Sequence, residues 1–178
     1  ATGQKRYEDA GKVARQGGYG SAGTVECLVD KSGNHCFIEM NPRIQVEHTV
    51  TEMVTGVDLV RAQILIAEGH PLSTPEIGIP SQDAVHMNGY ALQCRVTTEA
   101  PAHNFAPDPG KITAYRSGRG LGVRPDRGND FTGAEISPYY DSLLVKVTPW
   151  AHPFTGVCRQ AIRATRQAPV RAAPTNLP

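Results

Sequence analysis

The sequence predicts an α+β protein in which a helix, a β-hairpin and two further helical segments precede a run of short antiparallel strands. Three observations predict it: an apolar stripe at helical spacing near the start, strict two-residue alternation around residue 40, and short β-prone segments between glycine-rich turns after residue 89. The 178 residues, 39% hydrophobic and 20% charged, can bury a core in one or two domains.

Charge and hydropathy exclude two classes of partner. The 18 Lys and Arg nearly balance the 17 Asp and Glu, so no basic surplus favours binding to nucleic acid. The apolar stretches, such as residues 64–67, are far shorter than the roughly 20 residues that span a bilayer, and the polar start is no secretory signal. We therefore expect neither nucleic acid nor a membrane as partner.

The cysteines show no metal-binding or disulfide pattern. Their spacing contains no Cys-x-x-Cys pair and no companion histidines. We expect free, mostly buried thiols in a reducing compartment at all four positions, Cys27, Cys36, Cys94 and Cys158.

The first elements are a helix and a hairpin. Apolar residues 7, 10, 13 and 14 form one face of a helix over residues 5–16, which Gly17 and Gly18 end. Residues 24–30 and 35 onward form two strands around a turn centred on Ser32 and Gly33. This turn predicts a register in which Cys27 faces Ile38 and the opposed pairs are Glu26 with Glu39, Leu28 with Phe37, and Val29 with Cys36.

The second strand is predicted to extend to residue 47, because residues 38–47 (Ile-Glu-Met-Asn-Pro-Arg-Ile-Gln-Val-Glu) alternate without exception. A capping box of Thr49 and Glu52 then opens a helical turn, and residues 57–68 form a buried helix. Residues 89–97 form another strand. Four short strands follow at residues 111–116, 121–124, 132–136 and 142–147, with a helix at 155–166.

A glycine-rich motif at residues 18–23 matches G-x-G-x-x-G. The dinucleotide-binding version must follow a strand and open a helix, because the helix N-terminus holds the pyrophosphate. Here a helix precedes the motif and a strand follows it. We interpret these glycines as a helix stop and a tight turn.

The hairpin carries the candidate metal site. Glu26 opposite Glu39 would be destabilising for two bare carboxylates, so we expect a cation between them. Asn41 projects from the same face, and two carboxylates with an amide oxygen suit Mg²⁺ or Mn²⁺. Such a site keeps room for water and for phosphate oxygens of a nucleotide triphosphate.

Farther along the same predicted face come Arg43, Gln45 and Glu47, about 6.6 to 7 Å apart in a strand. Arg43 offers a planar fork to a small oxyanion, Gln45 an amide, and Glu47 a base, which together suit phosphoryl transfer. An amphipathic strand with one solvated face explains the same pattern. By spacing alone, Arg95 on its strand is a surface charge or an ion-pair partner.

Four stretches resemble the biotin carboxylases, members of the ATP-grasp superfamily. Residues 37–52, which continue as His-Thr-Val-Thr-Glu after the alternating stretch, resemble the family signature closely. Residues 93–99 (Gln-Cys-Arg-Val-Thr-Thr-Glu), 105–112 and 138–146 are also similar to this family. The Arg-Val-Thr-Thr-Glu form is most similar to the pyruvate carboxylase branch of the family.

The resemblance implies a role for each candidate residue. Glu26, Glu39 and Asn41 hold the metal ions that bridge ATP phosphates. Bicarbonate binds to Arg43, Gln45 and the backbone of Val46, and Glu47 deprotonates it for attack on the γ-phosphate. The catalytic set is then Arg43, Glu47 and Arg95, where Arg95 steadies bicarbonate and the enolate-like oxygen of biotin.

The resemblance also implies a domain organisation. Residues 1–72 correspond to the C-terminal part of an ATP-grasp domain, and residues 73–178 to a small antiparallel β-rich C-terminal domain. ATP, Mg²⁺ or Mn²⁺, and biotin carried on another domain or chain are the implied cofactors. Implied partners are a missing N-terminal half, biotin carboxyl carrier and carboxyltransferase domains, and further copies in a homo-oligomer. We expect a fragment that turns over little substrate alone, located in the cytoplasm, or in the mitochondrial matrix of a eukaryote.

Two other functions stay open. The chain could come from an acetyl-CoA or propionyl-CoA carboxylase subunit, which the downstream acceptor domain would distinguish. It could also be a non-catalytic dimerisation or scaffold module, because the family's β-rich domain takes part in subunit contacts.

Overall fold

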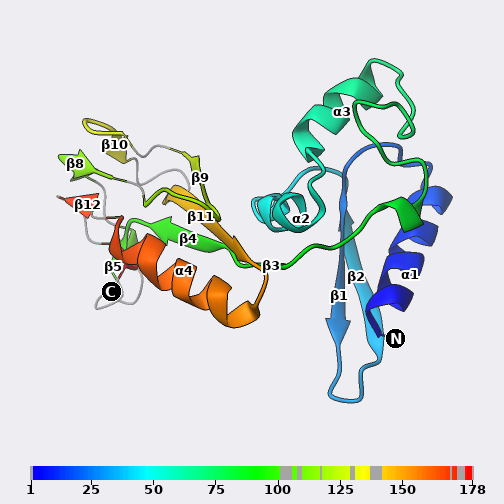
Figure 1. Ribbon diagram of the computed structural model, residues 1–178, viewed down its shortest axis with the longest axis horizontal. Helices are drawn as coiled ribbons and strands as arrows, with labels where there is room; N and C mark the ends of the chain where they lie inside the picture. The colour runs from blue at the N-terminus through cyan, green and yellow to red at the C-terminus, as the bar shows by residue number, and fades with distance from the viewer. Residues whose placement is uncertain are drawn as a thin grey trace. The chain divides into compact units, whose positions relative to one another are not determined.

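The computed structural model describes residues 2–100, 106–107, 110–116, 118–128, 131–136, 142–168, 170–171 and 175–177. The chain forms two compact units, Ala1–His48 with Gly56–His86, and Thr49–Thr55 with Met87–Pro178. Each unit contains helices and antiparallel strands, which confirms the α+β class (Figure 1). The domain boundary that we placed between residues 72 and 73 stays a prediction.

The first unit is built around a two-stranded antiparallel hairpin. Its elements are α1 (Thr2–Gln16), β1 (Thr24–Val29), β2 (His35–Asn41), α3 (Leu59–Ala67) and the 3₁₀ helix η1 (Gln82–Ala84). The His35 ring lies 3.1 Å from the Asp9 carboxylate, which ties β2 to α1. The helix α3 begins after Asp58, whose side chain caps it by accepting a hydrogen bond from the Arg61 N–H at 2.8 Å.

The register of the hairpin confirms one predicted pair and corrects the others. Glu26 lies opposite Glu39, as predicted. Nearer the turn every pair is shifted by one residue, so the predicted contacts of Leu28 with Phe37, Val29 with Cys36 and Cys27 with Ile38 are wrong. The observed pairs are Cys27 with Phe37, Leu28 with Cys36, and Val29 with His35.

Two irregularities of one residue each explain this register. The turn holds three residues instead of two, because the Asp30 N–H bonds the Asn34 carbonyl at 2.9 Å and Gly33 adopts a φ of 86° that favours glycine. A bulge beside Glu26 and Cys27 then leaves Ile38 as the extra residue of β2. The second shift cancels the first, so the two glutamates still meet.

The strand β2 ends at Asn41, so the prediction that it continues to residue 47 is wrong. Pro42 has no N–H to pair, and the Arg43 N–H turns back to the Asn41 carbonyl at 2.8 Å. Asn41 already lies opposite Thr24, the first residue of β1, which leaves no partner for a longer strand. Residues 42–47 therefore form bends and turns despite their alternating pattern.

The second unit contains short strands and two helices. The segments predicted at residues 89–97, 111–116, 121–124, 132–136 and 142–147 each contain observed strands, and the predicted C-terminal helix is present. Its elements are α2 (His48–Thr55), β3 (Tyr90–Ala91), β4 (Cys94–Thr97), β5 (Glu99–Ala100), β6 (Ala106–Pro107), β7 (Gly110–Lys111), β8 (Ala114–Tyr115), β9 (Val123–Arg127), β10 (Glu135–Ile136), β11 (Leu143–Ala151), α4 (Phe154–Arg166) and β12 (Val170–Arg171).

The strand β11 lies at the centre of the main sheet of this unit. It pairs with β9 along one edge and with β3 and β4 along the other (Figure 1). Leu92 lies between β3 and β4 in the sequence, and its N–H donates to the Pro149 carbonyl of β11. The strands β3 and β4 therefore pair with the same edge of β11 in one continuous register. Lys146 consequently lies between Arg95 on β4 and Asp126 on β9.

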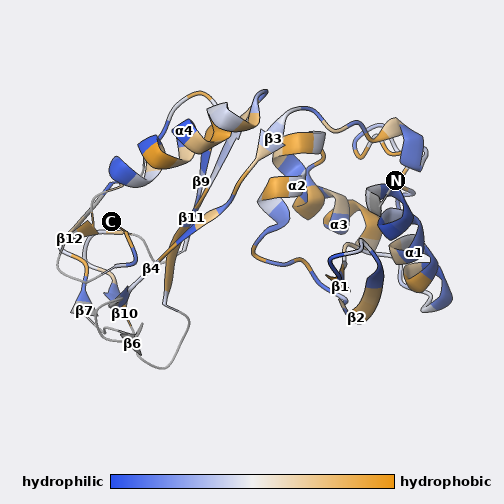
Figure 2. Ribbon diagram, turned by 90° about the horizontal axis from the view of Figure 1, so that it is seen from below, coloured by the Kyte–Doolittle hydropathy of each residue, from blue (hydrophilic) through white to orange (hydrophobic). Residues whose placement is uncertain are grey.

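The sheet has an apolar face and a polar face. Side chains alternate along β11, so Val145 and Val147 face one side while Lys146 and Thr148 face the other. Val145 and Val147 are fully buried in a core that includes Ala164 of α4, a helix that carries hydrophobic and hydrophilic residues on different sides (Figure 2). The core residues are Val96, Ile112, Val123, Ala134, Leu144, Val145, Val147 and Ala164.

All four cysteines are free thiols, as predicted, but they are not mostly buried. Cys36 is exposed and the other three are half-buried. Burial raises the pKa of the Cys94 thiol. In the part of the chain that the structure describes, no helix combines the length and apolar character that a membrane crossing requires.

Removal of a core side chain tests the sheet packing. Leu144 is 1% exposed, so Leu144→Ala should lower the free energy of unfolding by about 2 to 5 kcal/mol through lost burial and a residual cavity. Leu121→Ala is the matched control, because Leu121 is 95% exposed and its loss should cost less than about 0.5 kcal/mol. Equal effects in urea unfolding would contradict this core.

The three-residue turn can be tested through one carboxyl group. Asn34 donates side-chain and backbone hydrogen bonds to the Asp30 carboxylate at 2.9 and 2.8 Å, which lowers the pKa of Asp30. This stabilisation is present above the unfolded pKa and is lost as the pH falls through the folded pKa. Asn34→Ala should move the pKa of Asp30 up toward 3.8 in an NMR titration, whereas Asn88→Ala should leave it unchanged.

Candidate functional site

The two hairpin glutamates share one amide. Asn41 Nδ2 donates to Glu26 Oε1 at 3.0 Å and to Glu39 Oε1 at 2.9 Å. Two like charges on paired strands repel, and an N–H₂ group with two donors placed between them offsets that repulsion. The three residues predicted as metal ligands therefore come together on one side of the hairpin.

Gln45 reaches the same cluster, although not along a strand. Because the chain turns after Asn41, Gln45 Nε2 lies 3.0 Å from Glu26 Oε1 and donates to it. Glu26 Oε1 thus accepts from two amides. Gln45 Oε1 is buried and has no hydrogen-bond donor among the described residues. A buried acceptor without a donor is costly, so this oxygen suits a ligand that brings an O–H or N–H group.

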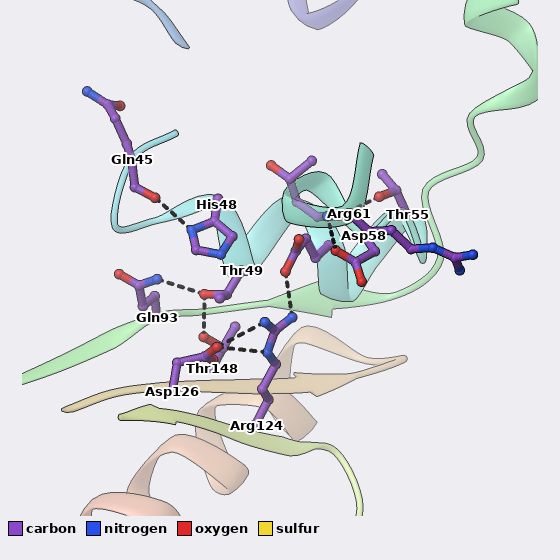
Figure 3. Close-up of polar contacts among 12 residues, drawn as sticks. Gln45, His48, Thr49, Thr55, Asp58, Arg61, Gln93, Arg124, Asp126 and Thr148 are labelled. Carbon is purple, nitrogen blue, oxygen red and sulfur yellow. Dashed lines mark hydrogen bonds and ion pairs between the residues drawn. The ribbon is translucent and has the colours of Figure 1, made fainter. Parts of the chain in front are cut away.

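Arg43, Gln45 and Glu47 do not form the evenly spaced row that a strand would give, because β2 ends at Asn41. Arg43 is exposed, with Nη1 3.2 Å from the Ile44 carbonyl, and Glu47 is exposed in the turn before α2. Val46 is half-buried. The turn is pinned by His48, whose Nδ1 lies 2.7 Å and backbone N–H 3.2 Å from the Gln45 carbonyl (Figure 3). No sequence pattern predicted this role of His48.

The helix α2 starts at His48, before the predicted N-cap Thr49, so the Thr49–Glu52 capping box is wrong. Thr49 lies inside the helix, and its hydroxyl is 2.7 Å from the Thr148 hydroxyl and 2.8 Å from Gln93 Nε2 (Figure 3). Glu52 bonds Arg124 Nη1 at 2.6 Å. Both side chains contact the polar face of the β11 sheet instead of the helix N-terminus.

Arg124 links α2 to β9. Besides Glu52, it holds Asp126 Oδ1 through Nη2 at 2.9 Å and Nε at 3.2 Å. Burial opposes the charged form, but the hydrogen bonds to Asp126 and Glu52 outweigh it, so the pKa of Arg124 is raised. Glu52 is 6% exposed, and a buried carboxylate requires such a partner.

Arg95 lies on β4 in the second unit and is exposed. Its Nε is 3.4 Å from Gln93 Oε1, and Lys146 lies opposite it on β11. Burial lowers the pKa of Lys146, and the Asp126 charge partly offsets that effect. Arg95 is therefore held in a cationic part of the sheet, beside a second positive side chain.

The hairpin cluster has the chemistry of a hard-cation site. It offers two carboxylates and an amide, whereas the described residues contain no cluster of three His, Cys, Asp or Glu side chains placed to bind a metal. Oxygen ligands of this kind favour Mg²⁺ or Mn²⁺ over Zn²⁺. Three protein ligands also leave coordination positions for water or phosphate.

The shared amide can be tested by removal. Asn41→Leu removes the one amide that bonds both Glu26 and Glu39 and leaves only the Gln45 donor on Glu26, so the opening free energy of the β1–β2 amides should fall by about 1 to 3 kcal/mol at pH 7. Hydrogen exchange measures this locally.

Adding Glu39→Gln to that variant should recover part of the loss, because it removes one charge and supplies a new amide donor. The control Asn88→Leu, at an exposed position, should leave hairpin exchange unchanged. No recovery in the double variant would show that the carboxylate repulsion is unimportant.

Two families match the chain. Residues 2–75 match the family described as carbamoyl-phosphate synthase L chain, ATP binding domain. Residues 93–178 match the biotin carboxylase C-terminal domain. Parts of the family-like stretches, at residues 105, 108–109 and 138–141, lie outside the described residues.

The chain is 52% identical to pyruvate carboxylase of Bacillus subtilis over 171 residues, which are 96% of the chain and 15% of that protein. It matches a structure of Rhizobium etli pyruvate carboxylase with 53% identity and a TM-score of 0.91, over 98% of this chain and 17% of that one.

A third match is the biotin carboxylase domain of Hydrogenobacter thermophilus 2-oxoglutarate carboxylase, solved with MgADP and bicarbonate. That match has 42% identity and a TM-score of 0.88 over 94% of this chain and 35% of that one. The chain thus spans about 15% of the length of the pyruvate carboxylases that it matches. These matches place the chain in the biotin carboxylase family of the ATP-grasp superfamily, with similarity to pyruvate carboxylases over nearly its whole length.

Proposed function

We propose that this chain contributes metal, bicarbonate and biotin contacts to the ATP-dependent carboxylation of biotin, in an enzyme of the pyruvate carboxylase type. The observation that supports it most is the cluster of Glu26, Glu39, Asn41 and Gln45, in which candidate metal ligands bond directly to a candidate bicarbonate ligand. Phosphoryl transfer to bicarbonate requires both groups at one site.

Glu26, Glu39 and Asn41 would hold Mg²⁺ or Mn²⁺ with ATP. The residues fit the ion, because two carboxylates already converge on one point that the Asn41 N–H₂ group occupies. Rotation of that amide by half a turn would present Oδ1 as a third oxygen ligand. When bound, the ion neutralises the charge of the ATP phosphates.

Bicarbonate would lie next to this cluster. The Arg43 guanidinium, the Gln45 side-chain amide and the backbone of Val46 would contact its oxygens. Glu47, exposed in the turn before α2, would take the proton. The oxyanion then attacks the γ-phosphorus of ATP, ADP leaves, and carboxyphosphate forms.

Carboxyphosphate would break down to CO₂ and phosphate, and the biotin ureido nitrogen would attack CO₂ as it loses its proton to that phosphate. Arg95 would stabilise the negative charge that develops on the ureido oxygen. Lys146, opposite Arg95, adds positive potential to this part of the sheet. A cation held on a strand is well suited to this task, because its backbone is fixed by pairing with β11.

The chain matches only a small part of its relatives, so the remaining steps need other parts of such an enzyme. The proposed partners are an N-terminal ATP-binding half, a biotin carrier, a carboxyltransferase domain that uses pyruvate, and further copies of the enzyme. We propose a location in the cytoplasm or, in a eukaryote, in the mitochondrial matrix. Matches to pyruvate carboxylases favour this function over an acyl-CoA carboxylase or a non-catalytic scaffold.

Substitution of the proposed base tests this function in the full-length protein. Glu47→Gln should lower bicarbonate-dependent release of phosphate from ATP by about 10²- to 10⁴-fold, because the amide cannot accept the proton. The Michaelis constant for MgATP should change little. Phosphate release with and without bicarbonate, with biotin as acceptor, gives the measurement.

The matched control is Glu68→Gln, an exposed glutamate just after α3, which should keep the original rate. An unchanged rate in Glu47→Gln would exclude Glu47 as the base. Absence of bicarbonate-dependent phosphate release from the unaltered protein would overturn the proposed function itself.

A further inference from the structure

Gln93 uses both ends of its side-chain amide, and each end contacts a different element. Its Nε2 donates to the Thr49 hydroxyl of α2 at 2.8 Å (Figure 3), and its Oε1 accepts from Arg95 Nε at 3.4 Å. Gln93 lies between β3 and β4, two residues before Arg95 on the same face. All of these contacts belong to the second unit.

The Thr49 end of this connection is firmly held. Thr49 and Thr148 are both 0% exposed, and their hydroxyl oxygens are 2.7 Å apart. Because the Thr49 oxygen accepts from Gln93, its own proton can go to Thr148, and each group then has a defined role. Buried hydrogen bonds of this kind are costly to break, so α2 has a fixed position on the sheet.

The Arg95 end needs such a support. Its backbone is fixed, because the Arg95 carbonyl accepts from Asn176 Nδ2 at 2.9 Å and the residue pairs with Lys146. Its side chain is long and exposed, with many accessible rotamers, and the positive charge of Lys146 repels it. The contact from Gln93 uses Nε and takes neither terminal nitrogen, which are the atoms that grip an oxyanion in a bidentate way.

Gln93 thus ties the Arg95 side chain to α2 within the second unit. Thr49 follows Glu47 by two residues, and α2 begins between them at His48. We propose that Gln93 is a positioning residue for biotin carboxylation, which sets the direction of the Arg95 guanidinium relative to α2. This inference rests on the proposed function and adds a residue to it.

The loss of this contact should separate two steps of the reaction. Carboxyphosphate formation depends on the hairpin cluster and Glu47, whereas transfer to biotin depends on Arg95. With the guanidinium misdirected, ATP should still be cleaved while less of the CO₂ reaches biotin. The affinity for bicarbonate should also weaken, because Arg95 contributes to its site, but the affinity for MgATP should not.

The experiment compares Gln93→Met with Gln93→Glu in the full-length protein. Methionine keeps the length of the side chain and removes both polar contacts, whereas glutamate can accept from Arg95 and from the Thr49 hydroxyl together. The matched control is Gln82→Met, at an exposed position in η1. The readouts are biotin carboxylated per ATP cleaved and the Michaelis constants for bicarbonate and MgATP.

For Gln93→Met we expect carboxylated biotin per ATP to fall roughly 10- to 100-fold, with a raised constant for bicarbonate. Gln93→Glu should stay within about threefold of the original ratio, and Gln82→Met should equal it. A ratio counts only folded enzyme, so partial unfolding of a variant does not change it.

An unchanged ratio in Gln93→Met, or an equal fall in Gln93→Glu, would overturn the positioning role while leaving the proposed function intact. Absence of bicarbonate-dependent turnover in the unaltered protein would overturn both.

Discussion

The first unit is organised around two carboxylates that must face each other across a pair of strands. Glu26 and Glu39 repel in this position, and the Asn41 amide stabilises them by donating to both. The arrangement is therefore conditional, because it needs either an amide donor or a cation at the midpoint. The same property suits the proposed metal site: a divalent ion in place of the amide donor would gain from both charges.

The bulge at Ile38 is what makes this meeting possible. Counting from the three-residue turn, an uninterrupted ladder would place Ile38 opposite Glu26, with an apolar side chain facing one acid. One extra residue moves Glu39 into place and brings Asn41 opposite Thr24 at the end of β1. The end of β1 in turn lets the chain bend after Asn41, and the bend delivers Gln45 to Glu26. The irregularities of this hairpin thus bring the residues of the proposed site together.

The sequence could predict the Glu26–Glu39 pair only because two errors cancelled. A two-residue turn and a regular ladder give the same pair as a three-residue turn and a bulge, so the alternation of residues 38–47 could not distinguish them. That alternation also extends through Pro42, where pairing ends for lack of a partner strand, a long-range fact absent from the local pattern. The helices α1, α3 and α4 were predictable because each has its own periodicity and stop signals.

Local sequence patterns could not predict which residues hold α2 in place. Thr49 and Glu52 have the spacing of a capping box, yet their partners are Thr148, Gln93 and Arg124, between 44 and 99 residues away in sequence. Apolar burial is non-directional, whereas these contacts have fixed directions and lose their energy when displaced. A helix that starts directly after a proposed catalytic base benefits from that difference. Polar anchoring therefore suits α2 better than the apolar packing that serves α4.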